Sequence, residues 1–234
     1  MRIQPGGEFR FSAGQYATIG IQTSSKHFER PYSIASSPYE SELEFFLELV
    51  PHGELTPQLY ELQVGDTVTV RKSARGRFTL DRESGHSNHL LVCTVTGVAP
   101  FVSYVRTLYK DWKENRSTQH KLFLLEAASR SSEFGYREEL ERYAAKVPWL
   151  KCVFTISRSW EDPDWHGEVG RAEDIVRKYS DMWGLAPEST TAYLCGHPNM
   201  VQNASGILVR RGWRKESIRH ELYFIPKPQS VATV

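Results

Sequence analysis

The alternation of hydrophobic and polar residues changes character near residue 85. From residue 9 to residue 80, short apolar-polar alternations are separated by segments rich in Pro, Gly, Ser and Asp. This pattern is typical of antiparallel strands joined by turns, and closely spaced strands predict a β-barrel. A hydroxyl residue followed by proline, Thr56 and Pro57, predicts the start of one short helix. We expect strands at residues 14–21, 30–35, 43–50, 67–71 and 76–80, and this helix at residues 56–61.

Beyond a polar segment at residues 81–88, continuous apolar runs alternate with amphipathic helical patterns. This alternation predicts a doubly wound parallel sheet of five strands, with its ligand beyond the carboxyl ends of the strands. We expect strands at residues 89–94, 121–128, 150–157, 191–195 and 218–224, and helices at 101–115, 136–146, 172–179 and 198–211. The chain therefore divides into an antiparallel β domain at residues 1–85, an α/β domain at 86–224 and a tail at 225–234.

Composition and charge argue against three classes of ligand or partner: nucleic acids, membranes and metal ions. The 29 basic and 28 acidic side chains give a net charge of +1, which argues against a nucleic acid held by bulk electrostatics. No stretch approaches the roughly 20 apolar residues needed to cross a bilayer, so we expect a cytoplasmic protein without membrane contact. Three widely spaced cysteines and scattered histidines lack the spacing of metal ligands. We predict no metal site, and we expect a monomer.

The stretch formed by Arg30, Pro31, Tyr32 and Ser33 carries the first candidate chemistry. On an extended segment, the guanidinium could bind a phosphate, the ring could stack on a planar ligand and the hydroxyl could reach a ring nitrogen. These groups suit a flavin. An ordinary surface strand followed by a turn has the same sequence pattern. The flavin interpretation is favoured because three further stretches of the chain indicate the same kind of ligand.

Each of the other three stretches follows a predicted parallel strand. Residues 94–100 join a strand to a helix, where backbone amides and threonine hydroxyls can hold a pyrophosphate. Arg158 ends a strand and Arg171 lies nearby, so either could bind the 2′-phosphate that distinguishes NADP from NAD. Cys195 ends another strand, where a small thiol could touch a nicotinamide ring. Taken singly, each stretch can also be explained without a ligand: residues 94–100 as an ordinary turn, the arginines as surface charges, and Cys195 as a buried thiol.

Together the four stretches resemble the ferredoxin–NADP reductase superfamily, and most closely its bacterial ferredoxin/flavodoxin reductase branch. The resemblance runs from residues 9–16 to residues 221–224, and its most specific part is residues 30–33 followed by 43–46 and 52–56. It implies an FAD-binding β-barrel followed by an NADP-binding α/β domain. In the first domain, Arg30 would bind a phosphate of FAD, and Tyr32 and Ser33 would contact the ring and its N5 region. The remaining contacts to FAD would come from Pro31, Phe46, Glu54, Leu55 and Thr56.

The resemblance also assigns the dinucleotide site. The NADP backbone would lie on Thr94, Thr96 and Gly97, and its adenosine phosphate on Ser129, Arg130, Ser157, Arg158 and Arg171. The nicotinamide end would meet Cys195, Gly196, His197, Pro198, Met200, Glu221, Tyr223 and Phe224, where one of the last two rings would cover the flavin. Ser33, Cys195 and Glu221 are the expected catalytic residues.

The implied activity is hydride transfer between NADPH and flavin N5, with one-electron exchange to a separate ferredoxin or flavodoxin. Two basic clusters could receive such an acidic protein: Arg210, Arg211, Arg214, Lys215 and Arg219, or Arg71, Lys72, Arg75 and Arg77. One alternative is an NADH-dependent reductase component of an oxygenase, or a flavin or ferric reductase. Another is a flavin-holding electron-transfer or regulatory module without nicotinamide turnover.

Three positions depart from the family pattern. Val95 stands where members usually have glycine, and a β-branched residue is poorly suited to positive φ. We therefore expect weakened nicotinamide binding. Only eight residues precede Phe9, so either they form an abbreviated strand or the chain is shortened. Residues 225–234 run past the usual terminal aromatic, and either fold over the adenine or remain disordered.

Overall fold

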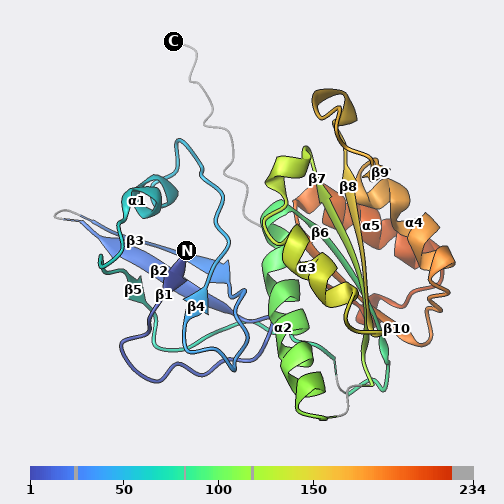
Figure 1. Ribbon diagram of the computed structural model, residues 1–234, viewed down its shortest axis with the longest axis horizontal. Coiled ribbons are helices and arrows are strands. Elements are labelled where there is room, and N and C mark those ends of the chain that lie inside the picture. The colour runs from blue at the N-terminus through green and yellow to red at the C-terminus, as the bar shows by residue number, and fades with distance from the viewer. Residues whose placement is uncertain (24–25, 82, 117–118, 223–234) are drawn as a thin grey trace.

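The computed structural model of the chain has two parts that lie side by side (Figure 1). It describes residues 1–23, 26–81, 83–116 and 119–222. The expectations for Tyr223, Phe224 and the tail at residues 225–234 lie outside the described residues.

The N-terminal part is built from antiparallel strands, as expected. Its main sheet has the order β3-β2-β5, with β2 at Tyr16–Gln22, β3 at His27–Ser33 and β5 at Thr69–Val70. A second sheet pairs β1 (Arg2–Ile3) with β4 (Leu43–Glu44), so the first residues do form an abbreviated strand. The helix α1 spans Thr56–Glu61, as predicted. Buried apolar side chains fill this part: Ala17, Ile19, Ile34, Leu43, Phe45, Leu55 and Leu59.

Two strand predictions for this part are wrong. No strand is assigned at residues 76–80, where Gly76 has a φ of +102° and the Phe78 carbonyl accepts a hydrogen bond from the Tyr104 hydroxyl. A side chain of the second domain thus replaces the expected strand partner. The strand predicted at residues 43–50 ends at Glu44: Phe45 stays in the core of the first part, and Phe46 packs against the core shared with the second domain.

The C-terminal part is a parallel sheet of six strands in the order β11-β10-β6-β7-β8-β9. The five predicted strands are all present: β6 (Asn88–Thr94), β7 (Lys121–Ala128), β8 (Leu150–Ile156), β10 (Thr190–Gly196) and β11 (Ile218–Leu222). The sixth strand, β9, is a two-residue segment at Glu168–Val169 that the sequence pattern did not indicate. It is too short to show any periodicity.

Helices cover both faces of this sheet (Figure 1). On one face lie α2 (Ala99–Lys113) and α3 (Arg137–Ala144), and on the other lie α4 (Ala172–Met182) and α5 (Pro198–Arg210). A sheet covered on both sides buries every side chain of its central strands, which explains the continuous apolar runs. Strand β6 shows this directly, because its residues 89–93 are all fully buried.

The two parts share one hydrophobic core on the α2 side of the sheet. Ala35 and Phe78 of the first part belong to the same buried cluster as Phe101, Tyr104 and Tyr193 of the second. The Phe78 and Tyr193 rings meet edge to face, with centroids 5.6 Å apart. A buried apolar contact of this kind is typical of two domains that are fixed relative to each other. It holds the β module against the α2 side of the sheet.

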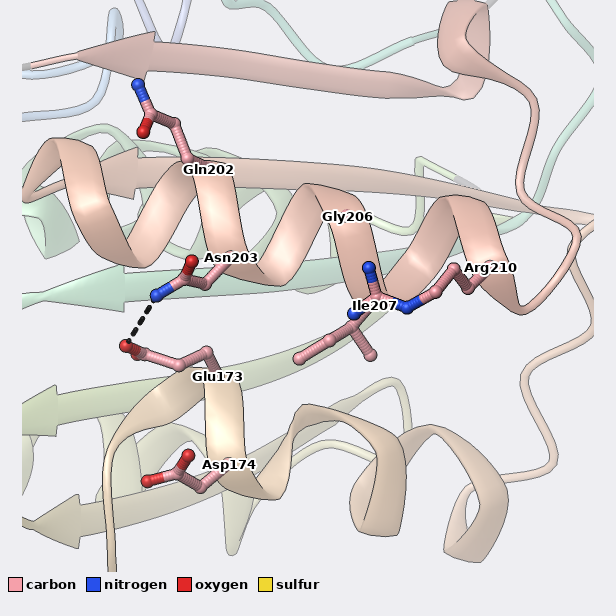
Figure 2. Close-up of a pocket in the computed structure, with 7 residues that line it drawn as sticks. All are labelled: Glu173, Asp174, Gln202, Asn203, Gly206, Ile207 and Arg210. Carbon is pink, nitrogen blue, oxygen red and sulfur yellow. Dashed lines mark hydrogen bonds between the residues drawn. The ribbon is translucent and has the colours of Figure 1, made fainter.

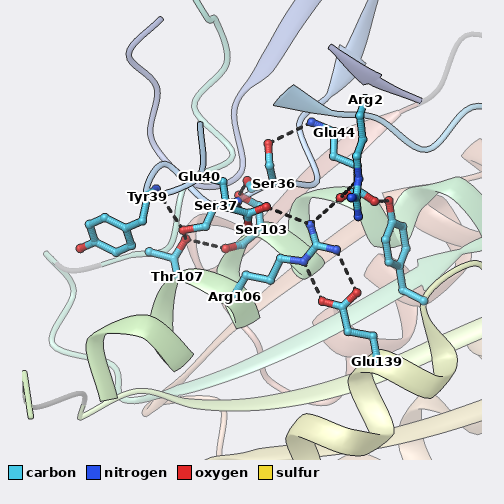
Figure 3. A network of polar contacts seen from close by, with 11 residues as sticks. Arg2, Ser36, Ser37, Tyr39, Glu40, Glu44, Ser103, Arg106, Thr107 and Glu139 are labelled. Atoms are coloured by element: carbon cyan, nitrogen blue, oxygen red, sulfur yellow. Dashed lines mark hydrogen bonds and ion pairs between the residues drawn. The ribbon is translucent and has the colours of Figure 1, made fainter. Parts of the chain in front are cut away.

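An ion-pair network centred on Arg106 reinforces this contact (Figure 3). From α2, the Arg106 guanidinium reaches Glu44 of β4 at 2.8 Å and Glu139 of α3 at 2.7 Å. The Tyr136 hydroxyl donates to the same Glu44 carboxylate at 2.9 Å. Burial opposes ionisation of Glu44, but the hydrogen bonds from Arg106 and Tyr136 hold its pKa below the ordinary value. The network therefore joins β4 to two helices of the other domain.

None of the helices in the described residues is long and apolar enough to cross a membrane. Nor do those residues contain a group of three or more histidine, cysteine or acidic side chains placed to hold a metal ion.

Candidate functional site

The predicted flavin stretch lies on strand β3. In the ladder with β2, Arg30 is opposite Ile19 and Ser33 is opposite Tyr16. The exposed Arg30 guanidinium lies 3.1 Å from the Glu54 carboxylate, which ties the strand to the loop before α1. Tyr32 is half-buried, and this burial raises the pKa of its hydroxyl. A cation and an aromatic ring thus lie on alternate positions of one strand, which share a face.

The loop expected to hold the flavin pyrophosphate is partly used for local structure. Leu55 is buried in the core of the β module, and it precedes α1 without capping it by a side chain. The Thr56 hydroxyl accepts a hydrogen bond from the Val50 amide at 2.9 Å and donates to the Val50 carbonyl at 3.3 Å. The hydroxyl fixes the loop, and Pro57 has no N–H, so the contribution left for a phosphate comes from separate backbone amides on either side of that proline.

Phe46 links the β module to the sheet domain. Its ring meets Tyr136 edge to face, with centroids 5.4 Å apart. A Cβ added at Gly135 would lie only 2.4 Å from the Phe46 Cζ, so this contact requires glycine. The ring expected to contact the adenine half of the flavin therefore already packs on the start of α3.

The loop after β6 and the end of β10 touch each other closely. The Thr94 hydroxyl accepts a hydrogen bond from the His197 amide at 2.9 Å. A Cβ at Gly97 would lie 2.4 Å from the Cys195 carbonyl oxygen, and one at Gly196 would lie 2.2 Å from the Thr94 hydroxyl oxygen. Both glycines are thus required by close backbone approach. Beside them, Pro198 begins α5, Met200 is buried, and Thr96 lies buried in the same loop.

Val95 adopts the strained backbone conformation that its position in the family pattern implies. Its φ is +45°, in the left-handed region that β-branched residues disfavour. It lies in the short helical turn Val95–Val98 between β6 and α2. The isopropyl group therefore lies at the turn where a dinucleotide backbone would approach.

Two cysteines and two glutamates lie in one row across the sheet. Cys195 and Glu221 were expected in the site, and Cys93 and Glu126 were not. In register, Glu221 of β11 is opposite Cys195 of β10, which is opposite Cys93 of β6, which is opposite Glu126 of β7. Burial raises the pKa of Glu221 to about 7. Glu126 is fully buried, neither of its oxygens has a hydrogen-bond partner among the described residues, and burial raises its pKa to about 8. At neutral pH Glu126 is therefore mostly protonated, whereas Glu221 is about half ionised.

Gly76 connects this row to the flavin strand. A Cβ added there would lie 3.0 Å from the Tyr16 ring and 3.4 Å from a carboxylate oxygen of Glu221. Since Tyr16 pairs with Ser33 in the β2-β3 ladder, and Glu221 pairs with Cys195, the structure brings the three expected catalytic residues to one boundary between the domains.

The residues expected to bind the adenosine phosphate gather at the ends of β7 and β8. The Ser157 amide donates to the Ala128 carbonyl at 3.0 Å, and the Arg158 amide to the Ser129 carbonyl at 3.1 Å. These bonds hold the two strand ends together. Arg171 precedes α4, where its amide donates to Asp174 at 3.2 Å. Both Arg130 and Arg158 reach Glu161, in the short turn Ser159–Glu161.

The residues present fit a flavin dinucleotide. A cation at Arg30, a half-buried ring at Tyr32 and amides at the start of α1 supply a phosphate contact, a stacking surface and further anion donors. The glycine at position 76 leaves room where any side chain would meet Tyr16. The donor chemistry therefore matches an anionic ligand with a large planar ring.

A depression between α4 and α5 is unrelated to this boundary. Figure 2 shows that it is lined by side chains of the two helices, where Asn203 donates to Glu173 at 3.4 Å. These helices cover the face of the sheet opposite the β module, and no predicted site residue lines the depression. Its mixed charges, from Asp174 to Arg210, offer no surface for a large ring.

Sequence reasoning missed several side chains at or near the site. Glu126 interrupts an otherwise apolar strand, and this buried acid was a signal available in the sequence. Tyr16 and Gly76 lie far apart along the chain, so only the fold brings them to Glu221. Glu161 follows Arg158 by three residues, a spacing common for surface ion pairs that gives no hint of its second partner, Arg130.

Comparisons with known proteins match both parts of the chain. Residues 3–80 match the oxidoreductase FAD-binding domain, and residues 91–206 match the oxidoreductase NAD-binding domain. The flavodoxin/ferredoxin–NADP reductase of Escherichia coli is 31% identical over 199 residues, covering 82% of this chain and 77% of that protein. The reductase component of the naphthalene 1,2-dioxygenase system of Pseudomonas putida is 31% identical, covering 96% of this chain and 64% of that protein.

A solved structure has the same fold. The crystal structure of a ferredoxin NADP+ reductase from Neisseria gonorrhoeae with bound FAD and NADP has a TM-score of 0.81, at 24% identity, covering 95% of this chain and 91% of that chain. With the matching domains and the Escherichia coli relative, these similarities identify the family. The chain belongs to the ferredoxin/flavodoxin–NADP reductase family, whose members are flavin-dependent NAD(P)H oxidoreductases.

Proposed function

We propose that this chain exchanges electrons between NADP(H) and a separate ferredoxin or flavodoxin through bound FAD. Residues 1–85 would hold the flavin and residues 86–224 the nicotinamide dinucleotide. The observation that carries the proposal is the contact at Gly76, which links Ser33, through Tyr16, to Glu221 and Cys195. The names of the bacterial relatives support the choice of substrate and partner.

When bound, FAD supplies a ring that takes up a hydride and passes on electrons singly. The residues of this chain then have positioning roles. Ser33 orients the ring by a hydrogen bond, and Cys195 packs at the end of β10 without acting as a nucleophile. Glu221 holds or releases a proton near neutral pH, because its pKa is about 7. Gly97 and Gly196 keep the dinucleotide loop close to the sheet.

We place the protein partner on the basic cluster at Arg71, Lys72, Arg75 and Arg77. Arg75 pairs with Tyr16 through backbone hydrogen bonds, so this cluster adjoins the boundary where the flavin would be exposed. The other basic cluster begins at Arg210, the last residue of α5. Because α5 starts at the carboxyl end of β10 and runs back along the sheet, its last turn, with Arg210, lies at the other end of the strands. Arg219 of the same cluster does lie at the domain boundary, but its guanidinium is already engaged by the Thr79 carbonyl and the Asp81 carboxylate, both at 3.0 Å.

An absorbance spectrum tests the proposal. We expect purified protein to carry flavin bands that bleach when NADPH is added without oxygen, and to recover when an acidic ferredoxin or flavodoxin is supplied. A flavin that neither NADPH nor NADH bleaches would overturn the proposal and favour a flavin-holding module without nicotinamide turnover.

A second candidate function is an NADH-dependent reductase component of an oxygenase. The observation that favours it is the pairing of both Arg130 and Arg158 with Glu161, which occupies the expected phosphate ligands. The Pseudomonas putida relative is named as the reductase component of a dioxygenase system, which supports the oxygenase part of this candidate, and its name, NAD(P), covers both cofactors. Reduction rates with NADPH and NADH at one concentration separate the two candidates.

A further inference from the structure

Two of the three arginines expected to bind the adenosine phosphate, Arg130 and Arg158, are already paired with a carboxylate of this chain. One carboxylate oxygen of Glu161 contacts the Arg130 guanidinium, and the other lies 3.6 Å from that of Arg158. Arg130 also lies 3.4 Å from Glu133. A single acidic side chain therefore bridges arginines from the ends of two neighbouring strands.

The backbone donors of the same region are occupied too. The Ser129 amide donates to Glu133 at 2.8 Å, and the Ser131 amide donates to Asp162 at 2.8 Å. The hydrogen bond from Ser131 holds the pKa of Asp162 below its ordinary value. Carboxylates of the chain thus take the positions that a phosphate would need, both at guanidinium groups and at backbone amides.

This arrangement changes what the arginines can do. Like charges within about 4 to 6 Å disfavour each other, so a dianionic phosphate can reach Arg130 and Arg158 only if Glu161 withdraws. An unphosphorylated ribose can bind without displacing Glu161, because its 2′-hydroxyl can donate a hydrogen bond to the Glu161 carboxylate. The carboxylate therefore penalises the phosphorylated ligand while tolerating the other.

We propose that Glu161 is a specificity-determining residue that acts as an internal counter-anion, lowering the preference of this enzyme for phosphorylated over unphosphorylated adenine dinucleotides. The inference rests on the proposed function for the class of ligand, a nicotinamide dinucleotide. The three side chains are 32% to 48% exposed, where ion pairs are weak and screened by salt. The expected effect is accordingly a several-fold change in affinity.

The test is calorimetric binding of two probes, 2′-phospho-AMP and AMP, to the flavin-loaded protein and its variants. Glu161→Gln keeps the size of the side chain and removes its charge. We expect it to bind 2′-phospho-AMP about threefold to tenfold more tightly, with AMP affinity unchanged or slightly lower. Glu161→Ser serves as a second neutral variant, in case the glutamine distorts the turn.

The control is Glu114→Gln, which removes a carboxylate paired with Lys110 at 3.0 Å near the end of α2. It should change neither affinity. Equal affinities of the wild type and both Glu161 variants for 2′-phospho-AMP would overturn the inference, as would an equal gain for AMP. Failure of the nicotinamides to bleach the flavin would overturn the proposed function alone, because these probes carry no hydride.

Discussion

Cys195 and Glu221 lie directly opposite each other across the parallel ladder between β10 and β11. Cys195 is fully buried, and Glu221 borders Gly76 of the β module. The thiol and the carboxyl therefore share one end of the sheet, at the boundary where the two domains meet. This placement gives the proposed hydride-transfer site a titratable group and a small packing residue on adjacent strands.

The first prediction concerns Glu221. Hydride loss leaves positive charge on the pyridine ring, which a carboxylate stabilises. Because the pKa of Glu221 is about 7, the rate of flavin reduction by NADPH should rise as pH increases through 7. Glu221→Gln should be severalfold slower at high pH and lose this inflection. Stopped-flow absorbance from pH 5.5 to 8.5 measures it.

Cys195→Ser is the matched variant on the opposite strand. It should slow reduction severalfold at every pH while keeping the inflection, because the charge of Glu221 is untouched. Both variants should retain their flavin absorbance. Reduction rates equal to wild type in both would remove Cys195 and Glu221 from the catalytic residues.

The second prediction concerns Val95, whose φ of +45° costs roughly 1 to 2 kcal/mol for an L-residue. Val95→Gly removes this cost but adds about 0.5 to 1 kcal/mol of chain entropy in the unfolded state, so stability should change little. The Michaelis constant for NADPH should fall severalfold, because the backbone can then approach the dinucleotide.

Val95→Ala keeps the Cβ and removes only the two methyl groups. It should give a Michaelis constant between those of the wild type and Val95→Gly. If neither variant lowers the constant in steady-state assays, the side chain at position 95 does not obstruct the dinucleotide.

The third prediction concerns Glu126 and pH. Its folded-state pKa of about 8 lies above the ordinary 4.5, so folding favours the protonated acid. Its contribution to stability is therefore complete below about pH 4.5 and is lost as pH rises towards 8. Glu126→Gln should match the wild type near pH 5 and exceed it by a few kcal/mol, on the order of 3 to 5, at pH 8.5.

Urea unfolding at several pH values measures this difference. Glu114→Gln, which alters an exposed carboxylate immediately after α2, is the control and should follow the wild-type curve. A gap between Glu126→Gln and wild type that stays constant with pH would show that the buried carboxyl does not titrate in this range.

The fourth prediction concerns the Arg106 network at the domain contact. The side chain of Arg106 is 10% exposed, and Arg106→Met would take this cation from the carboxylates of Glu44 and Glu139, leaving Glu44 with the more exposed Arg2 at 3.4 Å. Breaking such a pair costs about 3 to 5 kcal/mol. Lys110→Met, which removes an exposed pair from the same helix, should cost at most about 0.5 kcal/mol. Thermal unfolding distinguishes these losses, and similar values for both would contradict the prediction.

The fifth prediction separates the two basic clusters. Arg75→Glu should lower the rate of electron transfer to an acidic ferredoxin or flavodoxin severalfold at low salt, and flatten its salt dependence. Arg214→Glu, at the other end of the strands, should leave both unchanged. An effect of Arg214→Glu alone would place the partner at the other cluster. Rates of flavin reoxidation by the acceptor provide the measurement.

Much of the fold could be predicted from the pattern of residues. Strands β6, β7 and β10 could be predicted because burial on both faces leaves nearly uninterrupted apolar runs. The helix at Thr56–Glu61 was found from its hydroxyl and proline start. The prediction missed β9, because a strand of two residues shows no periodicity. It was wrong at residues 76–80, because Tyr104 of the second domain supplies the hydrogen-bond partner there.

Part of the candidate site was equally open to prediction. The strained turn at Val95 follows from a missing glycine, because only glycine adopts positive φ without cost. The Arg106 network, the row from Glu221 to Glu126 and the bridge at Glu161 were not predicted. Each joins residues that are distant in the chain, and no local pattern records which partner a charge will meet.

The sequence alone therefore determined the two kinds of domain, their order and the strand ends that carry the ligand chemistry, because periodicity and turn residues act locally. Only the tertiary structure decided that Ser33, Gly76 and Glu221 share one boundary, and that Arg130 and Arg158 both pair with Glu161. The physical reason is that electrostatics and packing depend on distance in space. Residues far apart in the chain, such as Arg130 and Glu161 or Gly76 and Glu221, come close to each other only when the chain folds.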